Sequence, residues 1–380
     1  MNKILVVGCG FSGIVISRLL TNLGYKCYII DERNHIGGNC YSEKYNEDTD
    51  IHVYGVHIFH TSRKDVWDFV NKYDHFNQFT LYVKALAGDN KYYSLPFNMN
   101  TFYQIFGTTD GKEISNIIKK EIDEAGIKEP RNLEEQAISM VGKTIYELLI
   151  KEYTEKQWNN SCKNLDKNII KRLPLRLSWN NNYYNDNYVG IPEHGYTTFM
   201  YNILNGLENE DPIEYSLNTQ FTLNNIDEIL MNYDYIIYTG QIDKLFDYKL
   251  GTLGWRSLNF DHKELLNTIE NDQHCPVLNY TSHNQLYTRS IDHYYFNHID
   301  NDYKDKTKII TYEYPEQYDK NKIAFYPINN ESNQKLQEQY IKLLKEKYPN
   351  IIPFGRLAEY QYLDMNNVIE KCFELIKMFN

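Results

Sequence analysis

Three glycines near the N-terminus have the spacing of a turn that binds a dinucleotide. Gly8, Gly10 and Gly13 follow the apolar run 3–7 and open a stretch with helical periodicity. In such a turn the first glycine permits a tight bend, the second lets the backbone approach a pyrophosphate, and the third allows helix and strand to pack closely. Because the N–H groups at the helix N-terminus are free to bind phosphate, the pattern predicts a dinucleotide cofactor.

Two further features distinguish between the cofactors that such a turn binds. Asp31 and Glu32 come about 20 residues after the turn, where an acid accepts hydrogen bonds from ribose hydroxyls. Gly37 and Gly38 follow shortly afterwards, and a second glycine pair at this point is frequent in FAD-dependent proteins of the amine-oxidase type. We therefore expect FAD rather than NAD, and the spacing alone predicts a flavin oxidoreductase.

The composition narrows the class of ligand and the location. The 380 residues carry a formal net charge of −11, which argues against general nucleic-acid binding because that needs a basic face. An anionic substrate remains compatible with this charge if a few arginines are placed locally. The six cysteines form no CxxC pair and the 11 histidines no HExxH motif, so no metal site is expected. With no apolar run near about 18 residues and no signal peptide, we expect a cytoplasmic protein without a membrane span.

Hydrophobic periodicity predicts the elements that position these residues. The apolar runs 3–7 and 26–30 indicate buried strands, whereas residues 111–160 and 365–378 have helical periodicity. Between about 250 and 330, short runs rich in Tyr, Thr, Val and Ile alternate with Asn, Asp and Pro, which is typical of antiparallel sheet.

Longer motifs occur in order along the whole chain. The most specific are YTEKQW at Tyr153–Trp158 and IIKRLP at Ile169–Pro174. NHIGGN at Asn34–Asn39, YGVHIFHT at Tyr54–Thr61 and YLDM at Tyr362–Met365 accompany them. By these motifs the chain resembles the bacterial-type UDP-galactopyranose mutases from end to end.

The resemblance implies an isomerase that uses FAD without net redox. Such enzymes interconvert the pyranose and furanose forms of a nucleotide-linked sugar, and N5 of reduced FAD bonds covalently to the anomeric carbon as the nucleotide diphosphate leaves. UDP-galactopyranose and UDP-galactofuranose, used for cell-surface polysaccharides, are the expected pair. The alternatives are dTDP-fucose or UDP-N-acetylgalactosamine as the sugar, and an amine-oxidase-like oxidoreductase as the class. The implied partners are a nucleotide sugar, a cellular flavin reductant and a second copy in a homodimer.

The resemblance also implies the fold. It is an α/β fold in which a Rossmann-like FAD-binding domain is assembled from separated segments, with an inserted helical domain and an antiparallel sheet domain. The FAD-binding domain is expected at residues 1–75, about 200–245 and 350–380, and the helical domain at about 100–180. The antiparallel sheet domain, which binds substrate, is expected at about 76–99, 181–199 and 246–349.

We expect arginines among the catalytic residues, because the leaving diphosphate needs positive charge in an acidic protein. Family comparison places Arg172 on a loop that closes over the substrate and Arg289 opposite it, with His57 near the isoalloxazine. Tyr153 and Trp158 would line the nucleotide pocket. Because these two aromatics are five residues apart, we expect their helix to end or bend between them.

The implied contacts form two sets. Cofactor contacts are expected at Gly8, Gly10, Ser12, Gly13, Asp31, Glu32, Gly38, Asn39, His57, Arg356 and Met365. Substrate contacts are expected at Thr80, Tyr153, Trp158, Arg172, Tyr183, Arg256, Asn279, Arg289, Tyr326, Tyr362 and Asp364. Asp364 is equally suited to cap the C-terminal helix, and Arg256 to support the site.

Two departures from the family pattern concern charge. Asp292-His293-Tyr294 replaces a Glu-His-Lys run, and Gln361 replaces a basic residue. We expect the loss of two cations near the sheet domain to alter how the sugar or the nucleotide is held, which leaves sugars other than galactose open.

Overall fold

Two compact units are built from interleaved segments in this computed structural model, which describes residues 2–47, 49–170, 175–296 and 306–379. Unit 1 comprises Met1–Phe79, Asp186–Trp255 and Lys320–Asn380, and unit 2 comprises Thr80–Asn185 and Arg256–Asp319. Segments 76–79, 186–199, 246–255 and 320–349, which we expected in the sheet domain, are part of unit 1. The division into three domains stays a prediction.

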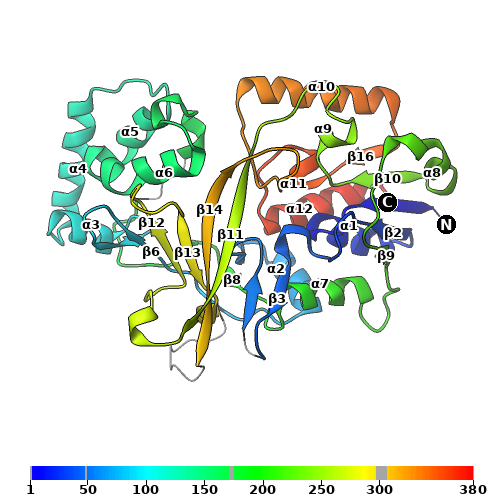
Figure 1. Cartoon of the computed structure of the whole chain (residues 1–380), viewed down its shortest axis with the longest axis horizontal. Coiled ribbons are helices and arrows are strands. Elements are labelled where there is room, and N and C mark those ends of the chain that lie inside the picture. The colour runs from blue at the N-terminus through cyan, green and yellow to red at the C-terminus, as the bar shows by residue number, and fades with distance from the viewer. Residues whose placement is uncertain (1, 48, 171–174, 297–305, 380) are drawn as a thin grey trace. The chain divides into compact units, whose positions relative to one another are not determined.

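A five-stranded parallel sheet forms the centre of unit 1 (Figure 1). Its strand order is β16-β10-β1-β2-β9, and every neighbouring pair is parallel. The bounds are β1 Lys3–Val7, β2 Lys26–Ile30, β9 Glu214–Ser216, β10 Tyr235–Tyr238 and β16 Ile351–Pro353. Ile4 and Val6 on β1 are fully buried, as expected for a central strand covered on both faces. The two N-terminal strands predicted from the sequence are confirmed.

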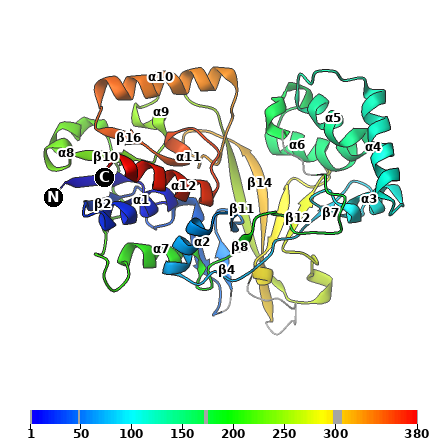
Figure 2. The same cartoon turned by 180° about the vertical axis from the view of Figure 1, so that it is seen from behind.

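Helices from the second and third segments of unit 1 pack against α1 (Phe11–Asn22), which comes from the first. α1 contacts both α7 (Gly195–Asn205) and α12 (Met365–Leu375), and α1 and α12 lie side by side in both views (Figures 1 and 2). Arg18 of α1 is fully buried and donates hydrogen bonds to the carbonyls of Ile203, Leu204 and Asp211, which ties α1 to the end of α7.

The remaining elements of unit 1 are short or peripheral. The helices are α2 Lys64–Tyr73, α8 Ile226–Asn232, α9 Ile242–Leu245, α10 Glu331–Lys347 and α11 Gly355–Ala358. The strands are β3 Ser42–Lys44, β4 Asp50–His52, β5 Phe59–Thr61, β8 Tyr188–Gly190 and β15 Tyr326–Pro327; β3 pairs with β4 and β5 with β8.

Unit 2 contains a sheet with the order β11-β14-β13-β12-β6-β7. The bounds are β6 Val83–Leu86, β7 Tyr92–Leu95, β11 Trp255–Leu266, β12 Val277–Tyr280, β13 Arg289–Asp292 and β14 Thr307–Gln317. The expected antiparallel arrangement is confirmed for four pairs, but β6 and β12 pair in parallel. The parallel pair is possible because a long excursion of the chain separates these two strands.

The helical part of unit 2 is less continuous than residues 111–160 suggested. It consists of α3 Met99–Phe106, α4 Gly111–Ala125, α5 Leu133–Ile145, a π-helical stretch Tyr146–Ile150 and α6 Lys151–Trp158. Gly126 caps α4 at φ 62°, and Gly142 kinks α5 at φ 80° and ψ 170°. Glycine adopts both conformations without a Cβ clash, so these two residues interrupt the helical pattern.

Candidate functional site

The glycine turn in unit 1 brings two backbone segments together. Gly10 bridges Gly37 in parallel, and a Cβ on Gly10 would lie only 3.6 Å from the Cα of Gly38. The structure assigns α1 no side-chain cap and no acid in its first turn. Its first N–H groups therefore remain available to an anion, and the arrangement fits the pyrophosphate of a dinucleotide.

The two acids expected at the ribose have different partners. Asp31 accepts the N–H of Cys9 at 2.6 Å with one carboxylate oxygen and the N–H of Arg33 at 2.8 Å with the other. Glu32 is half exposed and pairs with the Lys244 ammonium at 2.7 Å. Asp31 thus shapes the glycine turn itself, and a ribose contact for either acid stays a prediction.

Arg33 is a candidate cofactor residue that the sequence analysis missed. Its Nη2 donates to Asn39 Oδ1 at 2.9 Å, and its guanidinium carbon lies 5.2 Å from the centre of the Tyr54 ring. Its Nη1 is buried and has no hydrogen-bond partner within the described parts of the chain. A buried N–H without a partner is costly, so this atom fits an oxygen of a bound cofactor. Its position two residues after Asp31 is a signal that could have identified it.

The C-terminal segment of unit 1 contributes Arg356 beside the first helix. Gly355 has φ +86°, and a Cβ there would lie 2.7 Å from Ser12 Oγ, so only glycine permits this approach. The guanidinium carbon of Arg356 lies 4.7 Å from the centre of the Tyr362 ring, which in turn stacks on Tyr326 at 6.0 Å. The two tyrosines expected at the substrate are thus grouped with an expected cofactor residue.

Asp364 and Met365 lie at the start of α12. Asp364 is the N-cap residue, and its N–H donates to Asn367 Oδ1 at 3.3 Å in a capping box. The capping role considered for Asp364 is therefore confirmed. Contacts of Asp364 with substrate and of Met365 with the cofactor stay predictions.

His57 is held in one tautomer. Its Nδ1 lies 2.7 Å from the carbonyl oxygen of Gly55, so Nδ1 carries the proton and Nε2 has the lone pair. Burial lowers the pKa of His57 to about 4; the hydrogen bond to Gly55 opposes this shift and Arg356 reinforces it. At neutral pH the ring is therefore an uncharged hydrogen-bond acceptor at Nε2.

We expect the cofactor-free protein to lose stability as the pH falls from 6.5 to about 4. His57 takes up its proton near pH 6.5 when unfolded but only near pH 4 when folded, so the unfolded state binds more protons in this window. The free energy of unfolding that uncharged His57 contributes above pH 6.5 is therefore lost as the pH falls from 6.5 to about 4. Buried His293, whose pKa burial lowers to about 3, acts in the same direction. Urea midpoints at pH 7 and pH 5 should differ less in His57→Asn than in the unmodified protein; equal differences would contradict the assignment.

In unit 2, three strands bring charged and polar side chains into one row. Asn279 on β12 is the cross-strand partner of Arg289 on β13, which is the partner of Glu313 on β14. Arg289 Nη2 donates to Tyr153 Oη at 2.9 Å, and Arg289 Nε lies 3.4 Å from Glu313 Oε1. The side chain of Arg289 is 25% exposed, whereas that of Glu313 is 2% exposed.

This geometry leaves the Arg289 guanidinium able to bind an anion. Burial raises the pKa of Glu313, and Arg289 opposes that shift by stabilising the carboxylate. Burial likewise raises the pKa of Tyr153, with Arg289 again acting against it, so Tyr153 keeps its hydroxyl proton at neutral pH. Glu313 was missed because its relation to Arg289 arises from strand register and not from sequence spacing.

The other expected substrate residues in unit 2 have varied settings. Tyr153 and Trp158 both belong to α6, so the expected end or bend between them is wrong; the irregular stretch precedes Tyr153. Thr80 and Tyr183 are both exposed; Thr80 begins the segment Thr80–Asn185 of unit 2, and Tyr183 lies near its end. Arg172 lies outside the described residues.

Arg256 supports the architecture of unit 2. The residue is 2% exposed, its Nε donates to the carbonyl of Gln157 at 3.0 Å, and its Nη1 donates to Gln317 Oε1 at 3.0 Å. These bonds tie the end of α6 to β14. Of the two roles considered for Arg256, the geometry favours support of the site over a direct substrate contact.

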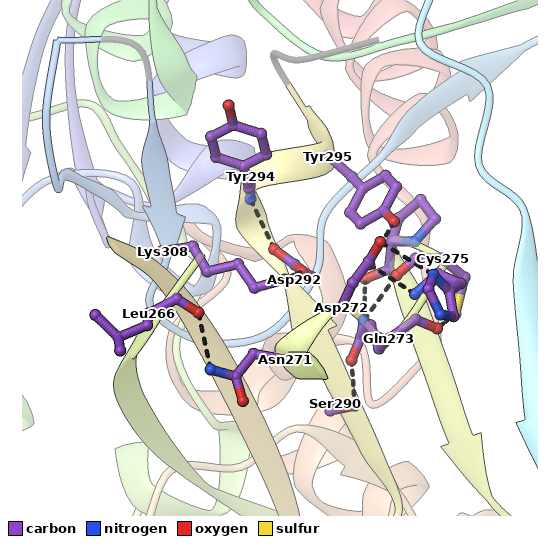
Figure 3. Close-up of polar contacts among 12 residues, drawn as sticks. Leu266, Asn271, Asp272, Gln273, Cys275, Ser290, Asp292, Tyr294, Tyr295 and Lys308 are labelled. Atoms are coloured by element: carbon purple, nitrogen blue, oxygen red, sulfur yellow. Dashed lines mark hydrogen bonds and ion pairs between the residues drawn. The ribbon is translucent and has the colours of Figure 1, made fainter. Parts of the chain in front are cut away.

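The segment Asp292–Tyr294 belongs to a buried polar network (Figure 3). The Asp292 carboxylate and the Lys308 ammonium form an ion pair at 2.6 Å with both side chains fully buried. His293 bonds to Thr311 Oγ1 at 2.7 Å, and Tyr294 is 2% exposed. These side chains thus lie in the core of unit 2, and the effect of the changed charges on ligand binding stays a prediction.

The described residues offer neither a metal-binding cluster nor a membrane-spanning helix. Within residues 2–47, 49–170, 175–296 and 306–379, no group of His, Cys, Asp or Glu is arranged to hold a metal ion. In the same parts of the chain, no helix is both long and apolar enough to cross a membrane.

A parallel Rossmann-like sheet with a glycine turn at its first helix defines unit 1 as a nucleotide-cofactor domain. A family model of a Rossmann-like NAD(P)-binding domain matches residues 6–73, and the model of UDP-galactopyranose mutase matches residues 148–362. The chain belongs to the UDP-galactopyranose mutase family. It is accordingly an isomerase, as expected from the sequence motifs.

Relatives of similar length support this membership. The chain is 36% identical to a dTDP-fucopyranose mutase from Escherichia coli, covering 100% of this chain and 98% of the relative. It is also 36% identical to a probable UDP-galactopyranose mutase from Klebsiella pneumoniae, covering 99% and 94%. A crystal structure of reduced UDP-galactopyranose mutase superposes with a TM-score of 0.75 at 16% identity, covering 100% of this chain and 94% of that one. The predicted α/β fold class is thereby confirmed.

Proposed function

We propose that the protein interconverts the pyranose and furanose forms of a nucleoside-diphospho sugar, with FAD bound in unit 1. The observation that carries the substrate proposal is Arg289, a partly exposed guanidinium held by Tyr153 and Glu313. A guanidinium in this setting suits a diphosphate, because it offers paired donors to its oxygens. Family membership supports the reaction class.

FAD is proposed to lie along the glycine turn. Gly10 would admit the pyrophosphate, Gly8, Gly13 and Gly38 would keep the turn compact beside it, and Arg33 would be an additional donor. When bound in its reduced form, FAD supplies a nucleophile for the anomeric carbon without net redox. The contacts expected from Ser12, Asp31, Glu32, Asn39, His57, Arg356 and Met365 are part of this proposal.

The chain's own residues would stabilise the departing group and orient the sugar. Arg289 would stabilise negative charge on the diphosphate as the bond to the anomeric carbon breaks, and Glu313 would keep its guanidinium oriented. Arg172 is proposed as a second cation. Uncharged His57 presents Nε2 as an acceptor for a hydroxyl proton. The substrate contacts expected from Thr80, Trp158, Tyr183, Asn279, Tyr326, Tyr362 and Asp364 complete the proposal.

We propose UDP-galactose as the substrate and dTDP-fucose as the second candidate. The second candidate is favoured by the Escherichia coli relative, which is as similar to this chain as the Klebsiella pneumoniae protein. Fucose lacks the hydroxyl at C6, and a site built to bind that hydroxyl rejects a substrate without it by about 10⁴-fold. A strong preference for UDP-galactose would therefore indicate a polar contact at C6 or recognition of the nucleotide, since UDP also has a ribose 2′-hydroxyl that dTDP lacks.

The two substrates should be compared side by side. Protein reconstituted with FAD and reduced by dithionite is incubated with UDP-galactofuranose and with dTDP-fucofuranose, and pyranose formation is followed by chromatography. We expect one sugar to be converted by the reduced protein and neither by the oxidised protein. Failure of the FAD-loaded, reduced protein to convert either sugar would contradict the proposal, and oxygen consumption with an oxidised product would favour the oxidoreductase. The flavin reductant, a homodimer and a cytoplasmic location remain proposals from the family.

A further inference from the structure

A lysine of α6 fastens the loop between β12 and β13. Lys156 Nζ donates to the carbonyl oxygens of Tyr280, Ser282 and Gln285 at 2.8, 2.8 and 3.0 Å. An ammonium group has three N–H donors, and each of them has one carbonyl acceptor here. Lys156 thus ties α6 to the last residue of β12 and to two residues of the loop that follows, residues 281–288.

Further contacts join the same loop to the helical part of unit 2. The N–H of His283 donates to Glu152 Oε2 at 2.8 Å, and His283 Nε2 lies 3.8 Å from Glu155 Oε2. Thr281 Oγ1 donates to the carbonyl of Leu148 at 3.0 Å. The loop is therefore held against the helical part of unit 2 by polar contacts in addition to those of Lys156.

The docked loop and its helix adjoin Arg289 and Tyr153, the pair that forms the proposed diphosphate site. Arg289 is the first residue of β13 and follows the loop directly, and Tyr153 lies three residues before Lys156 on the same helix. Residues three apart lie on one side of a helix. We propose that Lys156 is a positioning residue that fixes Arg289 against Tyr153 by clamping the 281–288 loop onto α6. The inference rests on the diphosphate role proposed for Arg289.

The chemistry of the three acceptors explains why a lysine is needed. A carbonyl oxygen that is shielded from water and loses its donor costs about 1–3 kcal/mol. Tyr280 and Ser282 are 9% and 7% exposed, so water compensates poorly for a lost ammonium. Burial lowers the pKa of Lys156 to about 8, while Glu152 opposes the shift, so the ammonium is mostly charged at pH 7.

The test compares Lys156→Met with Lys151→Met, a lysine on the same helix that is not a donor to this loop. UDP affinity is measured by calorimetry, and KM and kcat with reduced FAD. We expect Lys156→Met to weaken UDP binding and raise KM by about tenfold, the equivalent of 1.4 kcal/mol, with a smaller change in kcat. Lys151→Met should stay within about twofold, and the FAD spectrum should be unchanged in both. Unaltered UDP affinity in Lys156→Met would overturn the inference.

A double-mutant cycle separates positioning from general stability. If Lys156 acts through the Arg289–Tyr153 contact, Lys156→Met should weaken UDP binding much less when Tyr153→Phe is already present. Additive effects would overturn the proposal even if Lys156→Met lowers the melting temperature. If Lys156→Met does not fold, Lys156→Arg takes its place, because a planar guanidinium keeps the charge but not the tripod of donors. If the two substitutions affect UDP binding non-additively but the protein converts no sugar, the result would count against the proposed function and not against the role of Lys156.

Discussion

Arg289→Ala is expected to lower kcat/KM by about 10³-fold while the absorption spectrum of bound FAD stays unchanged. The substitution removes the guanidinium proposed to stabilise the departing diphosphate, and that interaction is stronger in the transition state than in the ground state. It also leaves the buried Glu313 carboxylate without the cation 3.4 Å away. We therefore expect kcat to fall more than the affinity for UDP, measured by steady-state kinetics and calorimetry.

Two companion variants make this prediction specific. Glu313→Gln keeps the shape of the side chain but removes its charge, and should lower kcat/KM by about tenfold through looser orientation of Arg289. Arg131→Ala is the matched control, because Arg131 is an 83% exposed arginine of the same unit that pairs with Glu135. It should leave activity unchanged. Near-normal kcat in Arg289→Ala would refute its assigned role.

Gly10→Ala is expected to weaken FAD binding by about 100-fold without unfolding the protein. The backbone of Gly10, at φ −86° and ψ −178°, is accessible to alanine, and the nearest protein atom to the new methyl would be 3.6 Å away. The cofactor-free protein thus has room for the methyl group. A pyrophosphate bound against the turn would collide with it. FAD titration and the melting temperature of the cofactor-free protein test the two halves of this prediction.

Gly13→Ala provides the contrast within the same motif. Its methyl would lie 1.9 Å from the carbonyl oxygen of Gly8, so α1 must move away from the turn. We expect a stability loss of about 3 kcal/mol and a lower melting temperature even without FAD. If Gly10→Ala bound FAD with unchanged affinity, or if both variants had the same melting temperature, the assignment of the turn would fail.

The local features of the fold were predictable from the sequence because they depend on neighbours in the chain. Strands 3–7 and 26–30 and the glycine turn between them were predicted with their observed bounds. The break of the helical region at Gly126 and Gly142 was not, because a glycine within a periodic pattern does not reveal whether it adopts a positive φ. The parallel pairing of β6 with β12 also escaped prediction, since it joins strands far apart in the sequence.

The sequence by itself determined the family, the isomerase class and the candidate charged residues. It could do so because a contiguous motif such as YTEKQW is recognisable without knowing which residues lie next to it in space. Only the tertiary structure decided which partners those residues contact. The register of β13 and β14 places Glu313 beside Arg289, and the end of β12 together with the loop after it offers three carbonyls to Lys156. The same packing buries Asp292 and His293 in the core of unit 2. The physical reason is that burial and cross-strand contact depend on packing between segments that are distant in the chain, which spacing along the sequence does not encode.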